Sequence, residues 1–318
     1  MLPPILPPML PIAIIGFGKI ARDQHVPALL ADPRFQLAAT VDPHTELEGV
    51  ARYRDVEALL AADTGVKAVA ICTPPSVRNT VARAAIAAGL HVLLEKPPGE
   101  TVDEVIELER LADEAGLTLF TAWHSREAAA VDTARDWLSA RAIDAVRIAW
   151  KEDIRVWHPG QEWILEAGGF GVFDPGINAL SILTHILPDA PLLVSARLSV
   201  PRGRASPILA TMELRSGNAP VSVDLDFLQE GPQRWDIEVD TPDGMLRLSH
   251  GGATLSIADV PVPASPNREY PRLYARFADL VAAHESDVDL SPLQLVTEAI
   301  AIGECVEIEP FAFERGTA

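Results

Sequence analysis

The sequence has few cysteines, and this scarcity limits the classes of protein to which it can belong. Cys72 and Cys305 are the two cysteines among 318 residues, and they form no spacing typical of a metal site. A disulfide-rich secreted fold or a cysteine-ligated metal centre would need more of them. No other cluster of ligand residues stands out along the sequence, so we expect a reduced, cytoplasmic protein that binds no metal.

Positive charge is also scarce. Lys and Arg number 26 against 45 Asp and Glu, which gives a formal net charge of −19, and the sequence pI is about 4.7. An acidic surface repels phosphate backbones and anionic lipids, so neither nucleic acid nor a membrane surface is an expected partner. No apolar run is long enough to span a membrane, and 48% hydrophobic residues are typical of a globular chain.

The first eleven residues contain five prolines and no basic residue. A secretory signal peptide begins with positive charge and continues into an apolar centre, which this segment does not do. We therefore expect residues 1–11 to form a flexible tail. The rest of the chain is long enough for two domains with separate cores.

The first half of the chain alternates between strand and helix patterns. Apolar runs of strand length occur at residues 12–15, 36–41, 66–72, 92–94 and 117–122, and the clearest helical patterns cover residues 77–89 and 101–115. This alternation predicts a doubly wound parallel sheet, a Rossmann domain over residues 12–125.

A glycine turn follows the first expected strand. Residues 16–21 read G-x-G-x-x-A and lead into a helical pattern, which is the context of a dinucleotide-binding turn. Gly16 permits the tight turn, and Gly18 lets the backbone approach a pyrophosphate. Asp42 ends the second strand, where an acidic side chain accepts hydrogen bonds from ribose hydroxyls and repels a 2′-phosphate. We expect NAD as the preferred cofactor and NADP as the second choice, although each feature alone is also typical of a structural turn.

Residues 92–98 form an apolar run that ends in Glu95, Lys96 and two prolines, so the strand stops there. Open parallel sheets bind ligands at the carboxyl ends of their strands, where a lysine is placed for proton transfer. The alternative is a plain ion pair at the end of a strand. The residues expected to bind the cofactor are Gly16, Gly18, Lys19, Ile20, Asp42, Pro43, Thr73, Pro74, Glu95 and Lys96.

The pattern changes after about residue 128. Strands are expected at residues 145–154, 193–200, 208–214, 221–228, 235–241, 245–248 and 253–257, and helices at 128–141, 176–187, 270–283 and 293–307. Their order predicts a second domain over residues 126–318, an α/β domain with a mostly antiparallel open sheet. Its last helix is a candidate to pack back on the first domain. An open sheet with one uncovered face favours a homodimer through that face.

This combination resembles the Gfo/Idh/MocA family of oxidoreductases over nearly the whole chain after the tail. The most specific features are Glu95-Lys96-Pro97 and the Gly-Gly segment that precedes Asp174. In the family, that aspartate and a histidine four residues later share a helix face beside the lysine. Here Asn178 stands in place of that histidine. Arg78 is a second departure, because it stands at another position where the family often has a histidine. Because asparagine does not titrate near neutral pH, the base is Lys96 or Asp174.

Within the family, the chain most resembles aldose 1-dehydrogenases, which oxidise the anomeric carbon of D-galactose or L-arabinose to the aldonolactone. The shared features are residues 16–27, residues 123–126, and Asp174 with Asn178. The resemblance implies hydride transfer from an aldose to NAD(P). It implies Lys96, Asp174 and Asn178 as catalytic residues and His124, Glu152, Trp157 and Trp235 as sugar contacts. The alternatives are another sugar or inositol dehydrogenase and a non-catalytic NAD-binding regulator.

Overall fold

The computed structural model describes residues 9–266 and 268–313 and divides into two compact units. The first unit comprises Met1–Ala122 and Tyr270–Asp289, and the second comprises Trp123–Glu269 and Leu290–Ala318. Most of the expected tail lies outside the described residues. Leu10 and Pro11, which we assigned to that tail, are the first residues of strand β1.

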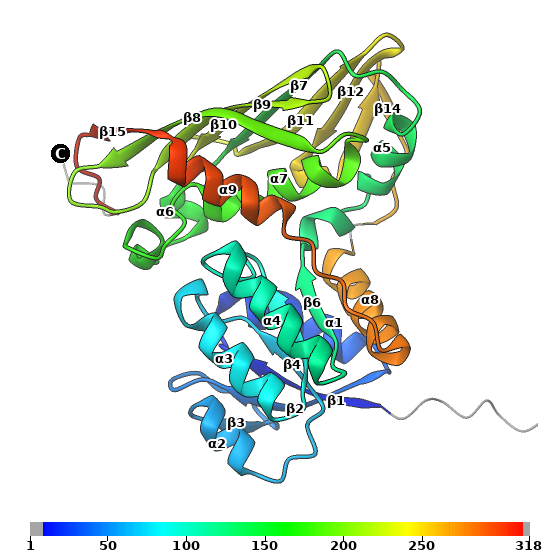
Figure 1. Cartoon of the computed structure of the whole chain (residues 1–318), viewed down its shortest axis with the longest axis vertical. Coiled ribbons are helices and arrows are strands. Elements are labelled where there is room, and N and C mark those ends of the chain that lie inside the picture. Colours follow the sequence, from blue (N-terminus) through cyan, green and yellow to red (C-terminus); the bar gives the residue numbers. More distant parts are fainter. Residues whose placement is uncertain (1–8, 267, 314–318) are drawn as a thin grey trace, which may run out of the picture. The chain divides into compact units, whose positions relative to one another are not determined.

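The first unit is built on a six-stranded parallel sheet with the strand order β3-β2-β1-β4-β5-β6 (Figure 1). The strands are β1 (Leu10–Ile15), β2 (Phe35–Val41), β3 (Ala51–Tyr53), β4 (Ala68–Ile71), β5 (His91–Glu95) and β6 (Leu119–Ala122). Strands β4 and β6 are buried at every residue, as expected of strands covered on both faces. The short edge strand β3 did not stand out in the sequence.

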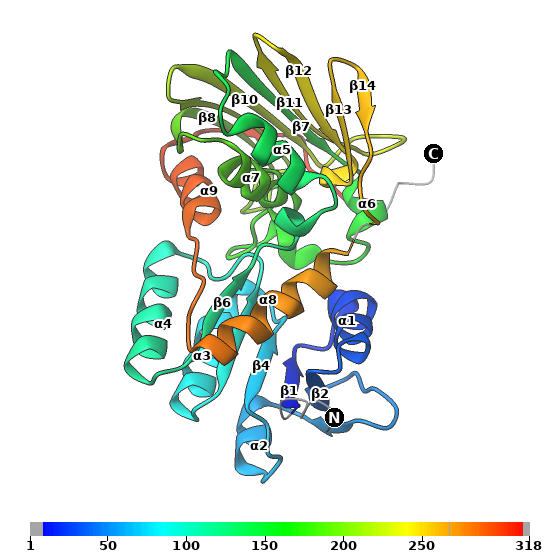
Figure 2. The same ribbon diagram turned by 90° about the vertical axis from the view of Figure 1, so that its right-hand side faces the viewer.

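Helices cover both faces of this sheet (Figures 1 and 2). They are η1 (Ala21–His25), α1 (Val26–Ala31), α2 (Val56–Ala61), α3 (Pro75–Ala87), α4 (Val102–Glu114) and α8 (Glu269–Ala283). Thr101 caps α4, because its side chain accepts a hydrogen bond from the Glu104 backbone N–H. The Glu104 side chain in turn accepts the Glu100 backbone N–H at 3.0 Å.

The helix that returns to the first unit is α8, whereas we expected the last helix of the chain to do so. Tyr270, Leu273, Tyr274, Phe277 and Leu280 follow the i, i+3, i+4, i+7 pattern of one helix face and are all buried in the core of this unit. After α8, Asp287 exchanges backbone hydrogen bonds with β6, and these cover part of that edge of the sheet.

The second unit contains a nine-stranded sheet in the order β14-β13-β12-β11-β7-β10-β9-β8-β15. The strands are β7 (Ala145–Lys151), β8 (Pro191–Pro201), β9 (Leu209–Ser216), β10 (Ala219–Asp226), β11 (Arg234–Thr241), β12 (Gly244–Ser249), β13 (Thr254–Ile257), β14 (Val260–Val262) and β15 (Glu304–Ile308). Two neighbouring pairs, β7 with β10 and β8 with β15, are parallel, and the other pairs are antiparallel. The predicted fold class is therefore confirmed.

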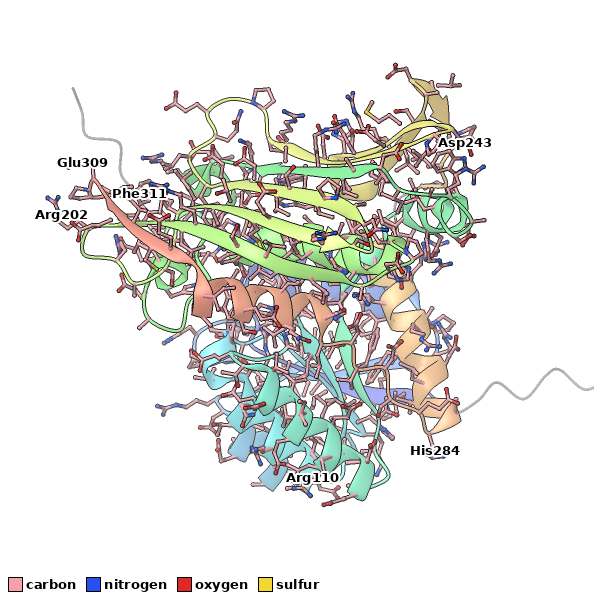
Figure 3. All side chains as sticks on the ribbon, turned by 45° about the horizontal axis from the view of Figure 1, so that its top comes forward. Arg110, Arg202, Asp243, His284, Glu309 and Phe311 are labelled. Atoms are coloured by element: carbon pink, nitrogen blue, oxygen red, sulfur yellow. The ribbon has the colours of Figure 1, made fainter. Side chains whose placement is uncertain are left out.

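One face of this sheet carries helices, and the other carries charged side chains. The helical segments are η2 (His124–Glu127), α5 (Val131–Leu138), α6 (Ile154–Trp157), η3 (Glu162–Leu165), α7 (Phe173–Ile186), η4 (His250–Gly252) and α9 (Ser291–Ile302). On the outward face, Arg147 pairs with Glu238 and Asp240, and Lys151 pairs with Asp224. Figure 3 shows such side chains standing on the strands.

The end of the chain differs from the expectation of a helix over residues 293–307. Helix α9 ends at Ile302, and β15 then pairs in parallel with β8. The break falls at Gly303, where an added Cβ would lie 2.4 Å from the Ala299 carbonyl oxygen. Glu304 and Glu307, both exposed, make the following segment better suited to an edge strand than to a buried helix face. No helix of residues 9–266 and 268–313 is long and apolar enough to cross a membrane.

Candidate active site

In the first unit, the predicted cofactor residues follow the carboxyl ends of neighbouring strands. Gly16 has φ +87°, and an added Cβ would lie 2.7 Å from the Thr73 backbone nitrogen, so this turn requires glycine. At Gly18, by contrast, an added Cβ would have no atom within 4 Å. That open space leaves room for the backbone to approach a pyrophosphate, as expected of the predicted dinucleotide-binding turn.

The Asp42 carboxylate is held by backbone amides. Its Oδ2 accepts the Phe17 N–H at 3.0 Å, and its Oδ1 accepts the N–H groups of His44 and Thr45, both at 2.8 Å. Burial on its own would raise the pKa of Asp42, but these hydrogen bonds outweigh it and lower the pKa below its ordinary value. Asp42 is therefore ionised at neutral pH and directly contacts the glycine turn.

The remaining predicted cofactor residues of the first unit lie around the same strand ends. Lys19 is exposed and pairs with Asp23, and Ile20 is also exposed. The Pro43 carbonyl accepts a hydrogen bond from Arg52 at 2.6 Å. Pro74 immediately precedes α3. The buried Arg78 guanidinium of that helix donates to the main-chain carbonyls of Thr73, Glu95 and Pro97.

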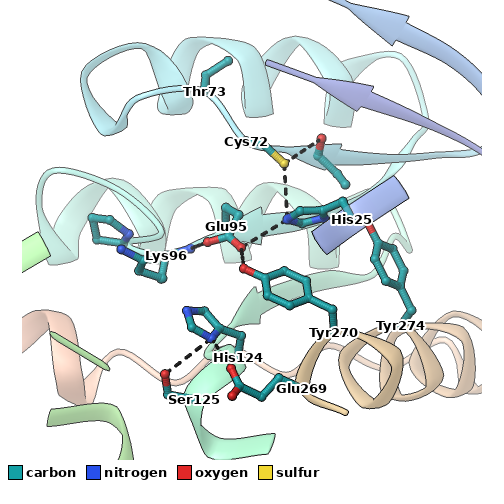
Figure 4. A network of polar contacts seen from close by, with 12 residues as sticks. His25, Cys72, Thr73, Glu95, Lys96, His124, Ser125, Glu269, Tyr270 and Tyr274 are labelled. Carbon is teal, nitrogen blue, oxygen red and sulfur yellow. Dashed lines mark hydrogen bonds and ion pairs between the residues drawn. The ribbon is translucent and has the colours of Figure 1, made fainter. Parts of the chain in front are cut away.

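The end of β5 combines a half-buried Lys96 with a buried Glu95, which is 3% exposed. Glu95 Oε2 accepts the backbone N–H of Lys96 at 2.6 Å, and Oε1 accepts the Tyr270 hydroxyl at 2.6 Å. The Nε2 atom of His25 also lies 3.1 Å from Oε1. Figure 4 shows His25, Tyr270 and the backbone of Lys96 meeting at the Glu95 carboxylate.

His25 lies within residues 16–27, which carry part of the family resemblance, but no role was predicted for it. It is 0% exposed, and its Nδ1 lies 2.7 Å from the Tyr274 hydroxyl. Burial lowers the pKa of His25, but Cys72, Tyr274 and Glu95 together outweigh it, and the net pKa lies well above its ordinary value. Its partners Glu95 and Tyr274 are distant in the sequence, so the sequence alone gave no signal of these contacts.

In the second unit, Asp174 and Asn178 lie four residues apart on α7, which begins three residues earlier than predicted. Asp174 is 7% exposed and Asn178 is half-buried. The glycines before them allow a close crossing, because an added Cβ at Gly171, where φ is +55°, would lie 2.1 Å from the Pro207 carbonyl oxygen. That crossing fixes the start of the helix that carries both side chains.

Three predicted sugar contacts of the second unit come together in one cluster. Glu152, 3% exposed, accepts the Trp235 indole N–H at 2.8 Å. The rings of Trp157 and Trp235 have centroids 4.8 Å apart, and Trp157 is 41% exposed. The sequence missed His158, whose Nε2 lies 3.1 Å from the other Glu152 oxygen. A carboxylate beside exposed indole is a pattern suited to sugars, because hydroxyls bind the acid and the ring stacks on apolar C–H groups.

His124, the fourth predicted sugar contact, begins η2. Its Nδ1 lies 2.6 Å from Glu269 and 3.4 Å from the Ser125 hydroxyl (Figure 4). Element η2 packs against α7, since Arg126 donates to the Ser181 carbonyl at 2.9 Å. Within the part of the chain that the structure describes, no group of three His, Cys, Asp or Glu side chains could hold a metal ion.

Comparisons with known proteins place this geometry in a family. Residues 10–123 match the family described as "Oxidoreductase family, NAD-binding Rossmann fold" (Gfo/Idh/MocA). Galactose 1-dehydrogenase from Pseudomonas fluorescens is 41% identical over 94% of this chain and 98% of its own length. This chain belongs to the Gfo/Idh/MocA family. The predicted family and the NAD(P)-binding Rossmann fold are thus confirmed.

Solved structures agree with the membership in Gfo/Idh/MocA. D-galactose-1-dehydrogenase from Rhizobium etli is 46% identical, with a TM-score of 0.92 over 96% of this chain and 99% of that one. A 3-ketoreductase from Actinomadura kijaniata, solved with NADP, has a TM-score of 0.81 over 94% of this chain and 99% of its own. It is 19% identical, so that likeness shows the fold alone.

The raised pKa of His25 predicts a pH dependence of stability. A group with a raised pKa stabilises the fold fully below its unfolded pKa of about 6.5 and loses that contribution as pH rises through the folded pKa. The stability of the wild type relative to His25→Gln should therefore fall from about pH 6.5 upward, by at most about 1.4 kcal/mol per pH unit. Thermal melts of both proteins from pH 6 to 10 measure it. A constant difference across the series would contradict the shift.

Proposed function

We propose that this chain is an NAD(P)-dependent aldose 1-dehydrogenase that oxidises C1 of D-galactose, or of L-arabinose, to the aldonolactone. The observation that carries the proposal is the Glu152, Trp157 and Trp235 cluster, in which a buried carboxylate meets partly exposed indole rings. The two relatives described above are galactose dehydrogenases by name and align with nearly the full chain, which supports the same substrate class.

The cofactor fits the residues of the first unit. Gly18 faces open space, the Gly16–Ile20 turn leads into a helix, and Asp42 is ionised beside that turn. Asp42 is suited to accept the ribose hydroxyls, and Thr73 and Pro74 line the end of the next strand. A nicotinamide cofactor held by these residues would supply the hydride acceptor for C1 of the sugar. We propose NAD as the preferred form, because Asp42 repels a 2′-phosphate.

Proton transfer falls to Lys96, with Asp174 as the alternative base. As C1 loses its hydrogen as hydride, the anomeric hydroxyl must lose its proton, and a neutral amine or a carboxylate can accept it. Asn178 carries no titrating group, so it can only orient hydroxyls. We propose that Glu152 and His124 bind the other hydroxyls and that Trp157 and Trp235 contact the apolar face of the ring.

A panel of aldoses tests the function directly. Purified protein with NAD should reduce the cofactor with D-galactose or L-arabinose, and more slowly with sugars that differ in configuration at C2 to C4. The formation of reduced nicotinamide and of the lactone is measured. Turnover of an inositol but not of aldoses would favour the second dehydrogenase class. Binding of NAD with no turnover of any of these compounds would favour a regulator.

Variants at three positions should identify the base. Lys96→Met should lower kcat by roughly 10²- to 10⁴-fold, the range for a lost acid–base group, while NAD still binds. Asn178→Ala should weaken sugar binding and turnover without moving the pH at which activity rises, because an amide does not titrate. Profiles of kcat/KM against pH are compared for both variants and for Asp174→Asn. If Asp174→Asn alone removes the rising limb, Asp174 is the base and Lys96 is not.

Asp42 should determine the cofactor preference. The wild type should have a higher kcat/KM and a lower Kd for NAD than for NADP, and Asp42→Ser should narrow both differences by removing the charge near the 2′ position. Steady-state kinetics and fluorescence titration of each cofactor provide the values. A wild type that prefers NADP by about tenfold, or about 1.4 kcal/mol, would show that Asp42 does not have this role.

We also propose a homodimer through the outward face of the nine-stranded sheet, and a cytoplasmic location, which the free thiols Cys72 and Cys305 support. Thr211 is the third residue of β9 and lies on its outward, exposed side. Light scattering should give the mass of two chains for the wild type and of one chain for Thr211→Arg. A single-chain mass for the wild type would refute the dimer, and cell fractionation tests the location.

A further inference from the structure

A buried polar network connects η1, the end of β5 and helix α8, all within the first unit. His25 lies at the end of η1, a wide π-helical turn that directly follows the glycine turn, and such turns are frequent at functional sites. Its imidazole has no exposed surface, and the rings of Tyr270 and Tyr274 meet it edge-on, with centroids 4.9 Å and 5.7 Å away. Both of its nitrogens have polar partners.

The two nitrogens of His25 face different groups. Nδ1 lies 2.7 Å from the Tyr274 hydroxyl. Nε2 lies 3.1 Å from Glu95 Oε1 and 3.5 Å from the Cys72 sulfur. Of these contacts, the one with Glu95 connects His25 to the proposed base, because Glu95 is hydrogen-bonded to Lys96.

Glu95 connects His25 to Lys96, because its carboxylate contacts both residues. One carboxylate oxygen is held by His25 and by the Tyr270 hydroxyl, and the other accepts the backbone N–H of Lys96. A buried carboxylate that loses a donor either takes up a proton or turns toward water. Either change removes or weakens the hydrogen bond that orients the Lys96 main chain. The Cα atom from which the Lys96 side chain extends is then less firmly placed.

We propose that His25 and Tyr270 are positioning residues for Lys96, acting through the Glu95 carboxylate. This proposal rests on the proposed role of Lys96 as the base of the reaction. Neither residue needs to touch substrate or cofactor. They hold the Glu95 carboxylate in place, and Glu95 in turn keeps the Lys96 backbone in one conformation. This matters for the rate because a small misplacement of a reacting group slows the reaction strongly.

The chain offers a matched pair of variants that separates positioning from packing. Tyr270→Phe and Tyr274→Phe each remove one hydroxyl from a buried tyrosine of the same helix. The first hydroxyl is hydrogen-bonded to Glu95 itself, and the second is hydrogen-bonded to Nδ1 of His25, on the side of the ring away from the nitrogen that meets Glu95. We expect Tyr270→Phe to lower kcat by about tenfold or more with less than a threefold change in KM, and Tyr274→Phe to leave both within about threefold.

Substitutions of His25 itself give a second, independent pair. The amide nitrogen of glutamine can occupy the place of Nε2 and donate to Glu95, whereas that of asparagine reaches only as far as Nδ1. His25→Gln should therefore retain kcat within about threefold, and His25→Asn should behave like Tyr270→Phe. A role in packing alone predicts that the four variants lose activity in proportion to their loss of thermal stability, whichever group they contact, and that result would overturn the proposal.

Nuclear magnetic resonance of the lysines provides a readout that does not depend on turnover. The sequence contains four lysines, Lys19, Lys67, Lys96 and Lys151, so ¹³C-methylated lysines give few signals, and Lys96→Arg assigns the one of interest. The Lys96 signal should shift in Tyr270→Phe and His25→Asn and stay in place in the other two variants. An unchanged signal in all four overturns the positioning role. A shifted signal in a protein whose Lys96→Met variant retains full turnover instead overturns the role of Lys96 as base.

Discussion

The buried carboxylate of Glu95 is the constraint on which the carboxyl edge of the first sheet depends. A carboxylate removed from water costs several kcal/mol unless charged or polar groups replace the lost hydration. The groups that do so come from η1, from α8 and from the chain that follows β5. The edge is therefore complete only when Tyr270–Asp289 has joined the first unit, and a fragment ending at Ala122 would leave Glu95 without its tyrosine partner.

Sequence reasoning succeeded where the signal is local. The glycine turn, Asp42 and the end of β5 are each encoded within a few residues, and strand ends of a parallel sheet meet at one edge whatever the rest of the chain does. The contacts of His25 are not local, because Tyr274 follows it by 249 residues and Glu95 by 70. No spacing rule connects such positions, and a single sequence contains no record of which helix returns to the first sheet.

In the second unit, too, some site residues could be predicted from the sequence and others could not. Family resemblance pointed to Glu152, Trp157 and Trp235, and these three come together. His158 and Trp150 complete the cluster, and neither could be found from the sequence, because strand alternation gives a facing direction but no partner. The misjudged end of α9 has a different cause: Gly303 was absorbed into an apolar helical pattern, although only a glycine fits that close to the Ala299 carbonyl.

The two departures from the family pattern have one consequence in common. Arg78 and Asn178 stand where the resemblance leads one to expect histidines, and one of them is always charged while the other never is. Arg78 ties the ends of β4 and β5 together through the carbonyls of Thr73, Glu95 and Pro97. Glu95 is thus fixed through its main chain by Arg78 and through its side chain by His25 and Tyr270. With no histidine at either position, the proposed proton transfer falls to Lys96 or Asp174. The contacts that fix Glu95 then matter for turnover, because they determine where the Lys96 backbone lies.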